Sequence, residues 1–206
     1  MGNKFLGVSY ILLGIPYLGV IGVVLVPIAW VVEGFDKRRR LWIVSGFLGL
    51  LAIALAVTGA VQTVAAVYPI LTKLSPQMGS LSNLSEQEIM QLMQEIKPYL
   101  MSGIVTFVAA ALAGLAFFIL MLVSLFQAGD LYLSNVIKVG AVLFITLFVF
   151  LIAGMGYVIA SATYGNAEGL SKAVTYVGVG SLIINFLASF TSGVGFLLSR
   201  PAEESP

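Results

Sequence analysis

The sequence predicts an all-α fold, a polytopic transmembrane helix bundle with about five spans. Two observations support this. Of the 206 residues, 60% are hydrophobic and only 9% are charged, with a mean hydropathy of +1.07, which is typical of integral membrane proteins. Moreover, the chain contains uncharged apolar segments longer than the roughly 20 residues that a membrane crossing needs. They lie at about 5–32, 41–72, 99–126, 139–163 and 173–199. Together they predict a single transmembrane domain over 1–200, followed by a polar tail at 201–206.

The first apolar segment is interrupted by glycine and proline. Gly14, Pro16, Gly19, Gly22 and Pro27 all fall within it. Proline removes a backbone donor and its ring clashes with the preceding turn, so we expect a kink or a break near Gly14–Pro16. The pattern leaves two alternatives open, which are one kinked span and a re-entrant pair of half-helices.

A hydrophilic segment at 73–98 separates the second and third spans. Ser85 and Glu88 have the spacing of a capping box, which marks the start of a helix. The apolar residues that follow recur on one helical face: Ile89, Leu92, Met93 and Ile96. We therefore expect a short amphipathic helix that ends at Pro98 and lies outside the cytoplasm, at the membrane surface or the outer ends of the bundle. Asn83 matches an N-glycosylation sequon.

Four consecutive cations, Lys37, Arg38, Arg39 and Arg40, occupy the short connection between the first two spans. By the positive-inside rule this connection is cytoplasmic, which places the N-terminus outside and, by alternation, the C-terminus in the cytoplasm. We interpret the cluster as a topology anchor in a plasma membrane. Binding of a lipid headgroup or phosphate is the alternative.

Side chains that commonly carry catalysis or bind metals are scarce. Cysteine and histidine are both absent, which excludes thiolate nucleophiles, Cys-based metal sites and the usual zinc and haem ligand. We expect no catalytic residue, no cofactor and no metal. None of the five spans contains an ionisable residue, and this disfavours proton pumps and carboxylate-based carriers.

Small and polar residues recur at helical spacing inside the spans. The second span carries Ala52, Ala56 and Ala60, and the last span carries Ser181, Asn185, Ser189 and Gly193. Such faces allow helices to approach closely and to hydrogen-bond across the interface. We interpret both as helix-packing faces. The polar stripe of the last span could alternatively line a conduit.

Three apolar stretches of the chain are rich in glycine and aliphatic residues: "LGVSYILLGIPYLGVIGVVLVPIAWVV", the following "LWIVSGFLGLLAIALAV", and "VIKVGAVLFITLFVFLIAGMGYVIAS". Through these stretches the chain resembles an archaeal family of multi-pass membrane proteins of unknown function. The resemblance covers most of the chain through glycine, proline and aliphatic patterns. It implies an archaeal plasma membrane, but no activity and no functional residues.

Taken together, the sequence predicts a non-enzymatic integral membrane protein. We expect a structural or accessory subunit of a larger membrane assembly or of a homo-oligomer, and the alternative is a small channel or carrier for a neutral solute. The expected partners are the lipid bilayer and other membrane subunits or further copies of the chain. The net charge of +1 provides no basic field for binding nucleic acid.

Overall fold

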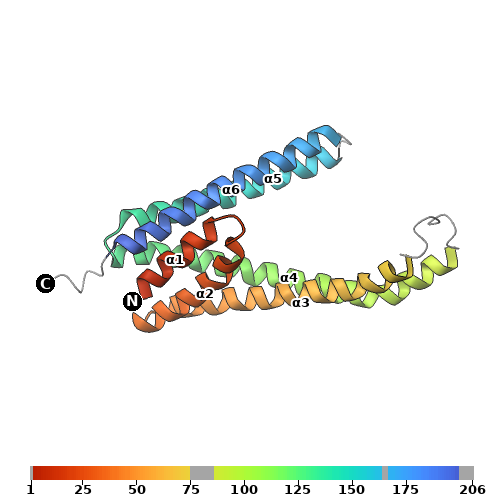
Figure 1. Cartoon of the computed structure of the whole chain (residues 1–206), viewed down its shortest axis with the longest axis horizontal. Helices are drawn as coiled ribbons and strands as arrows, with labels where there is room; N and C mark the ends of the chain where they lie inside the picture. Colours follow the sequence, from red (N-terminus) through yellow and green to blue (C-terminus); the bar gives the residue numbers. More distant parts are fainter. Residues whose placement is uncertain (1, 75–85, 164–166, 200–206) are drawn as a thin grey trace. The chain divides into compact units, whose positions relative to one another are not determined.

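The computed structural model describes residues 2–74, 86–163 and 167–199, and these residues form six helices (Figure 1). They are α1 (Gly2–Gly14), α2 (Gly19–Asp36), α3 (Arg40–Leu74), α4 (Glu86–Leu131), α5 (Asn135–Thr163) and α6 (Ala167–Leu198). The last five are long and apolar enough to cross a membrane. The predicted all-helical fold is therefore confirmed, and five of its helices have the length and composition that a membrane crossing needs.

The helices divide into two compact units. Unit 1 comprises Met1–Phe47 and Phe118–Pro206, and unit 2 comprises Leu48–Phe117. The long helices α3 and α4 each contribute residues to both units. All the residues of the candidate site described below belong to unit 1.

The first apolar segment, 5–32, is not one helix. It is broken after Gly14, and α2 begins at Gly19 and returns along α1 (Figure 1). At the break, Tyr17 adopts a left-handed conformation with φ of 67°. α2 approaches α1 so closely that a Cβ atom on Gly22 would overlap the backbone of Leu13. With 13 residues, α1 is about 20 Å long, shorter than the roughly 30 Å hydrocarbon core. The segment thus forms two helices and not one kinked helix, and of the two only α2 is long enough to cross a membrane.

This break bears on the expected placement of the termini. The side-chain amide of Asn3, at the start of α1, donates hydrogen bonds to the carbonyl oxygens of Ser199 (3.0 Å) and Phe196 (3.5 Å). The start of α1 and the end of α6 therefore lie at the same end of unit 1. α1 stops short and turns back, so a helix of its length would add no crossing. The orientation in the membrane, with the N-terminus outside and the C-terminus in the cytoplasm, stays a prediction.

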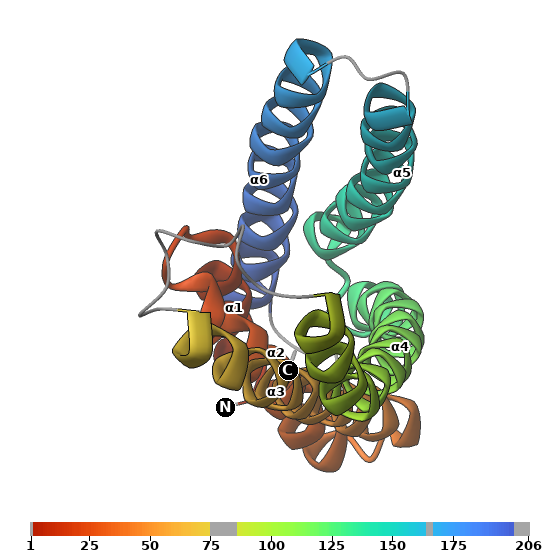
Figure 2. The same ribbon diagram turned by 90° about the vertical axis from the view of Figure 1, so that its right-hand side faces the viewer.

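Helices α5 and α6 run antiparallel and side by side in unit 1 (Figure 2). They approach closely at their small residues. A Cβ atom on Gly195 would lie 2.7 Å from Cγ1 of Ile137, and one on Gly154 would lie 2.7 Å from Cγ2 of Val177. Glycine at these positions therefore permits the two backbones to pack directly against opposing side chains.

Unit 2 pairs parts of α3 and α4. Thr106 donates a hydrogen bond to the side-chain oxygen of Gln62 over 2.9 Å, and a Cβ atom on Gly114 would contact that of Ala52 at 4.0 Å. Of the predicted small-residue face, Ala52 and Ala56 are half-buried and Ala60 is exposed. This face thus lies partly against α4 and partly on the surface.

The segment predicted as a short amphipathic helix falls within the first part of α4. This helix begins at Glu86, as the capping box indicates, but it continues through Pro98 to Leu131. The prediction that it ends at Pro98 is wrong. Proline lacks one backbone donor, and a helix that continues on both sides tolerates this loss. The extracytoplasmic location stays a prediction, and the sequon at Asn83 lies outside the described residues.

Candidate functional site: a buried carboxyl in an aromatic cluster

The core of unit 1 is an aromatic cluster centred on Phe196. The ring of Tyr10 stacks on Phe196 with centroids 6.0 Å apart, and Trp30 and Tyr132 approach it edge-on at 6.0 and 5.9 Å. Two further rings extend the cluster: Trp42 contacts Trp30 with centroids 5.2 Å apart, and Phe144 contacts Tyr10 at 5.9 Å. The cluster consists of Tyr10, Trp30, Trp42, Tyr132, Phe144 and Phe196. Each has at most 3% of its surface exposed.

Both tryptophans of the chain belong to this cluster, and both have hydrogen-bonding partners. The indole N–H of Trp30 donates to the hydroxyl of Tyr10 over 2.9 Å, and that of Trp42 donates to the side-chain oxygen of Gln127 over 3.2 Å. A buried indole N–H without an acceptor would be costly. These two bonds therefore fix the orientation of the rings as well as their burial.

A carboxyl group lies next to the aromatic rings. Glu33 is 1% exposed and accepts a hydrogen bond on Oε1 from the hydroxyl of Tyr132. Its other oxygen, Oε2, is buried and has no hydrogen-bonding partner among the described residues. Glu33 and Tyr132 thus form a hydrogen-bonded pair that is closed off from solvent.

Glu33 lies at the edge of the predicted spans. It follows the predicted span 5–32 directly and belongs to α2, one of the helices able to span a membrane, so this helix carries a buried ionisable residue. Its spacing also allows an ion pair with Lys37, four residues further on. Instead α2 ends at Asp36 and Lys37 caps it, while the Glu33 side chain bonds inward to Tyr132.

The sequence does contain a signal for this buried position. Val26, Trp30 and Glu33 follow one another at intervals of four and three residues, which places them on one face of a helix. All three are buried. The position of Glu33 on the same helical face as Val26 and Trp30 is therefore the signal in the sequence that indicates its burial.

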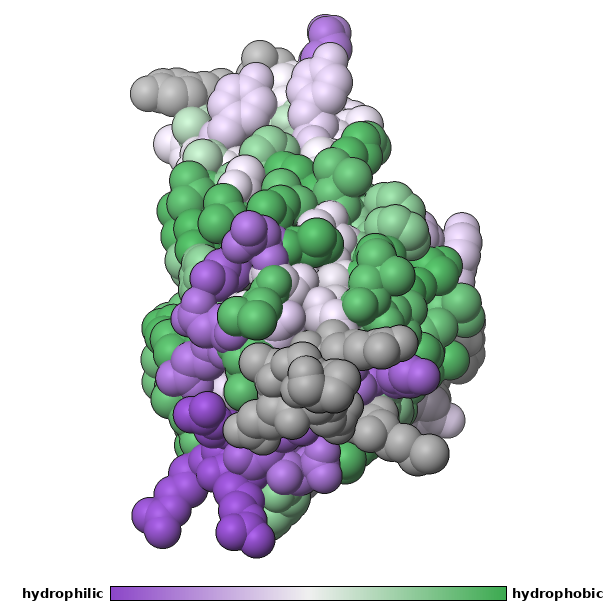
Figure 3. Space-filling model, turned by 90° about the vertical axis from the view of Figure 1, so that its left-hand side faces the viewer, coloured by the Kyte–Doolittle hydropathy of each residue, from purple (hydrophilic) through white to green (hydrophobic). Residues whose placement is uncertain are grey.

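The basic cluster forms the turn between α2 and α3. Arg38 has φ of 53°, and the N–H groups of Arg38 and Arg39 donate to the carbonyls of Phe35 (3.3 Å) and Gly34 (2.8 Å). This is a Schellman motif with a non-glycine residue in the left-handed position. The side chains of Arg38, Arg39 and Arg40 are exposed, and hydrophilic residues gather at this end of the molecule (Figure 3).

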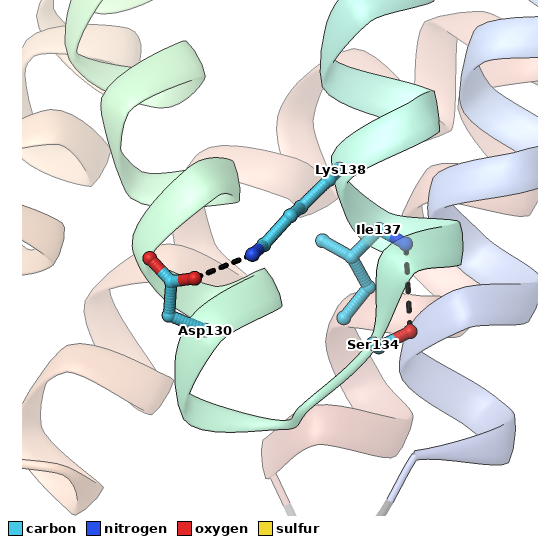
Figure 4. A network of polar contacts seen from close by, with 4 residues as sticks. All are labelled: Asp130, Ser134, Ile137 and Lys138. Carbon is cyan, nitrogen blue, oxygen red and sulfur yellow. Dashed lines mark hydrogen bonds and ion pairs between the residues drawn. The ribbon is translucent and has the colours of Figure 1, made fainter.

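The turn between α4 and α5 repeats the same design. Leu133 has φ of 49°, and the N–H of Ser134 donates to the carbonyl of Gly129 over 2.8 Å. An ion pair between Lys138 and Asp130, with 2.5 Å between Nζ and Oδ1, joins the two helices (Figure 4). The hydroxyl of Ser134 accepts from the N–H of Ile137 at 3.5 Å and so caps α5. This turn holds Tyr132 where it reaches Glu33.

Most of the polar stripe on α6 faces α1. The side-chain amide of Asn185 donates to the carbonyl of Leu13 over 3.3 Å, and the hydroxyl of Ser189 donates to Asn185 over 3.4 Å. Glycine at 193 allows contact with the backbone of Gly7. Ser181 instead donates to the carbonyl of Gly178 in its own helix. Asn185 thus satisfies a carbonyl that the end of α1 leaves without a helical partner.

Comparisons with protein-family models, with curated proteins and with solved structures found no match to this chain. The resemblance to an archaeal membrane family therefore stays a prediction. Within the described ranges, no three acidic residues gather where they could hold a metal ion.

The hydroxyl of Tyr132 offers a direct test of the buried pair. Tyr132→Phe keeps the ring against Phe196 but leaves both oxygens of Glu33 without a donor. We expect it to lower the free energy of unfolding by about 1–3 kcal/mol, the usual cost of an unsatisfied buried polar group. Denaturant titration of the protein in detergent would measure this loss. Tyr157→Phe on the exposed surface of α5 is the matched control, and an equal effect in both variants would contradict the pair's importance.

Proposed function

We propose that this chain is a non-enzymatic membrane protein that acts as a structural or accessory subunit, either of a larger membrane assembly or of a homo-oligomer. The observation that supports this most is a face of small residues on α5. Ala153, Gly156 and Ala160 follow at intervals of three and four residues and are all exposed. Small residues at this spacing are the usual contact face of associating membrane helices.

Another side of α5 already packs against a helix, α6. At Gly154, a Cβ atom would lie 2.7 Å from Val177 of α6, whereas at Gly156 it would meet no atom within 4 Å. Gly154 and Gly156 are two residues apart, and their surroundings differ because they lie on different sides of α5. The side that contains Gly156 has room for a helix from another chain.

The remaining parts of the proposal follow the sequence. The five apolar helices suit a membrane location, and the absence of cysteine and histidine disfavours enzymatic and metal-dependent functions. We place the protein in a plasma membrane, with the basic turn at the cytoplasmic face. Its partners in this proposal are the bilayer and either other membrane subunits or copies of itself.

Extraction in a mild detergent tests the proposal. We expect the protein to elute as a complex larger than its own 21.8 kDa after correction for bound detergent by light scattering. Gly156→Leu together with Ala160→Leu should shift it to the monomer, since bulky side chains keep a partner helix at a distance. Ile159→Val, at an exposed position of the same helix, should leave the size unchanged. A monomeric wild-type protein without other subunits would refute the proposal.

A small channel or carrier for a neutral solute is the second candidate. It is favoured by the break between α1 and α2, which lies beside Asn185 of α6. Broken helices that expose backbone groups at membrane depth occur at the substrate sites of many transporters. The buried Glu33 adds an ionisable group of the kind that marks transport pathways.

A further inference from the structure

The basic turn encloses a surface hollow. It has a volume of about 220 Å³ and is lined by Asp36, Lys37, Arg38, Arg39 and Leu131. The turn after α2 and the end of α4 therefore form its walls together. The hollow belongs to unit 1 and lies apart from the aromatic cluster, because its lining residues include none of the clustered rings.

Three backbone donors of the turn are already used within the chain. The N–H groups of Lys37, Arg38 and Arg39 donate to the carbonyls of Glu33, Phe35 and Gly34 over 2.9, 3.3 and 2.8 Å. A turn of this kind can bind anions through its N–H groups when they are free. Here an anion would be held by the side chains, and the guanidinium fork suits two oxygens of a phosphate.

The charge of the hollow is not balanced within the described part of the chain. Its ion pairs join Lys138 to Asp130 and Lys172 to Glu168, and neither includes a cation of the turn. Asp36 is the one acidic residue in the lining. Three adjacent cations, Lys37, Arg38 and Arg39, thus line the hollow with one carboxylate, which leaves an excess of positive charge for an anionic ligand.

Exposed apolar residues lie close in sequence to the lining residues of both walls. Phe35, next to Asp36, is 62% exposed, and Leu133, two residues after Leu131, is 80% exposed. A free phosphate ion would gain nothing from these side chains, but a lipid places acyl chains beside its headgroup. We propose that this hollow binds the headgroup phosphate of an anionic membrane lipid, with Arg38 and Arg39 as the main ligands.

The tryptophans provide a reporter for this proposal. The chain has two of them, and Trp42 lies two residues after Arg40. Their fluorescence can be quenched by brominated lipids in reconstituted vesicles. We expect brominated phosphatidylglycerol to quench more strongly than brominated phosphatidylcholine in 0.1 M salt, roughly the ionic strength at which exposed charges still act over about 10 Å. Higher salt should reduce this preference.

The variant Arg38→Asn with Arg39→Gln removes two of the cations, and asparagine tolerates the left-handed backbone at position 38. The preference for the anionic lipid should fall roughly 5-fold per cation, or about 25-fold in all. Lys172→Gln removes a cation near the start of α6, and this variant should retain the preference for the anionic lipid. An unchanged tryptophan emission maximum verifies the fold of each variant.

Two results would overturn the proposal. One is an equal preference for phosphatidylglycerol in the double variant and in the wild-type protein. The other is loss of the preference in 10 mM inorganic phosphate but not in sodium chloride of the same ionic strength, which would assign the hollow to free phosphate. Neither result depends on whether the protein is a subunit of an assembly.

Discussion

Gly193→Leu is expected to separate α6 from α1 and to destabilise unit 1. A Cβ atom at this position would lie 2.7 Å from the carbonyl oxygen of Gly7 and 2.6 Å from Cγ1 of Ile11. The opposing atom is backbone, so it cannot move away as a flexible side chain would. Overpacking of this kind costs about 3 kcal/mol at the upper end of its usual range. Thermal or denaturant unfolding in detergent would measure the loss.

Two comparisons make this result specific. Gly178→Leu lies on the same helix, but its Cβ atom would meet no atom within 4 Å, so it should leave the stability of unit 1 nearly unchanged. Asn185→Leu removes the hydrogen bond to Leu13 and should cost about 1 kcal/mol. If the polar stripe lines a conduit instead, Asn185→Leu should reduce solute flux in reconstituted vesicles without loss of stability, and that outcome would contradict the packing interpretation.

The second large effect concerns which residues are accessible from outside the cell. Because the chain contains no cysteine, single cysteines can be introduced at Lys4, at Phe35 and at Thr163, and all three positions are exposed. A re-entrant α1 would place Lys4 and Phe35 on the same side of the membrane, and a crossing by α5 would carry Thr163 to the other. With the basic turn inside, an impermeant thiol reagent applied to intact cells should label Thr163→Cys only.

Permeabilised cells provide the control, since all three variants should then react. Labelling of Lys4→Cys but not Phe35→Cys in intact cells would restore the simple alternation and show that α1 and α2 cross as one span. Labelling of Lys4→Cys and Phe35→Cys without Thr163→Cys would reverse the whole orientation. The expected difference is all-or-none, so it is independent of small changes in stability.

Helix identity could be predicted from the sequence because it depends on local composition. Each long apolar segment buries its own backbone hydrogen bonds, and only a helix does this within one segment in a membrane. Pro16 and Pro98 show the limit of this reasoning. Pro16 breaks its helix, where glycines lie on either side at 14 and 19, whereas Pro98 is accommodated within α4. Proline alone therefore does not decide between a break and a continuous helix.

The candidate site was less accessible to prediction. Its rings come from positions as far apart as Tyr10 and Phe196, and the bond between Glu33 and Tyr132 joins residues 99 apart in the chain. No periodicity within one helix indicates such a pair. The polar stripe was found because it lies within α6, but its partner, α1, could not be identified from sequence spacing.

The contacts of α1 also have a consequence for the order of folding. Its hydrogen bonds to α6 join residues 172 to 196 positions apart, nearly the full length of the chain. During synthesis the ribosome produces α1 well before its partner α6, and long-range contacts of this kind form slowly. α1 must therefore wait, paired with α2 alone, until α6 has been made.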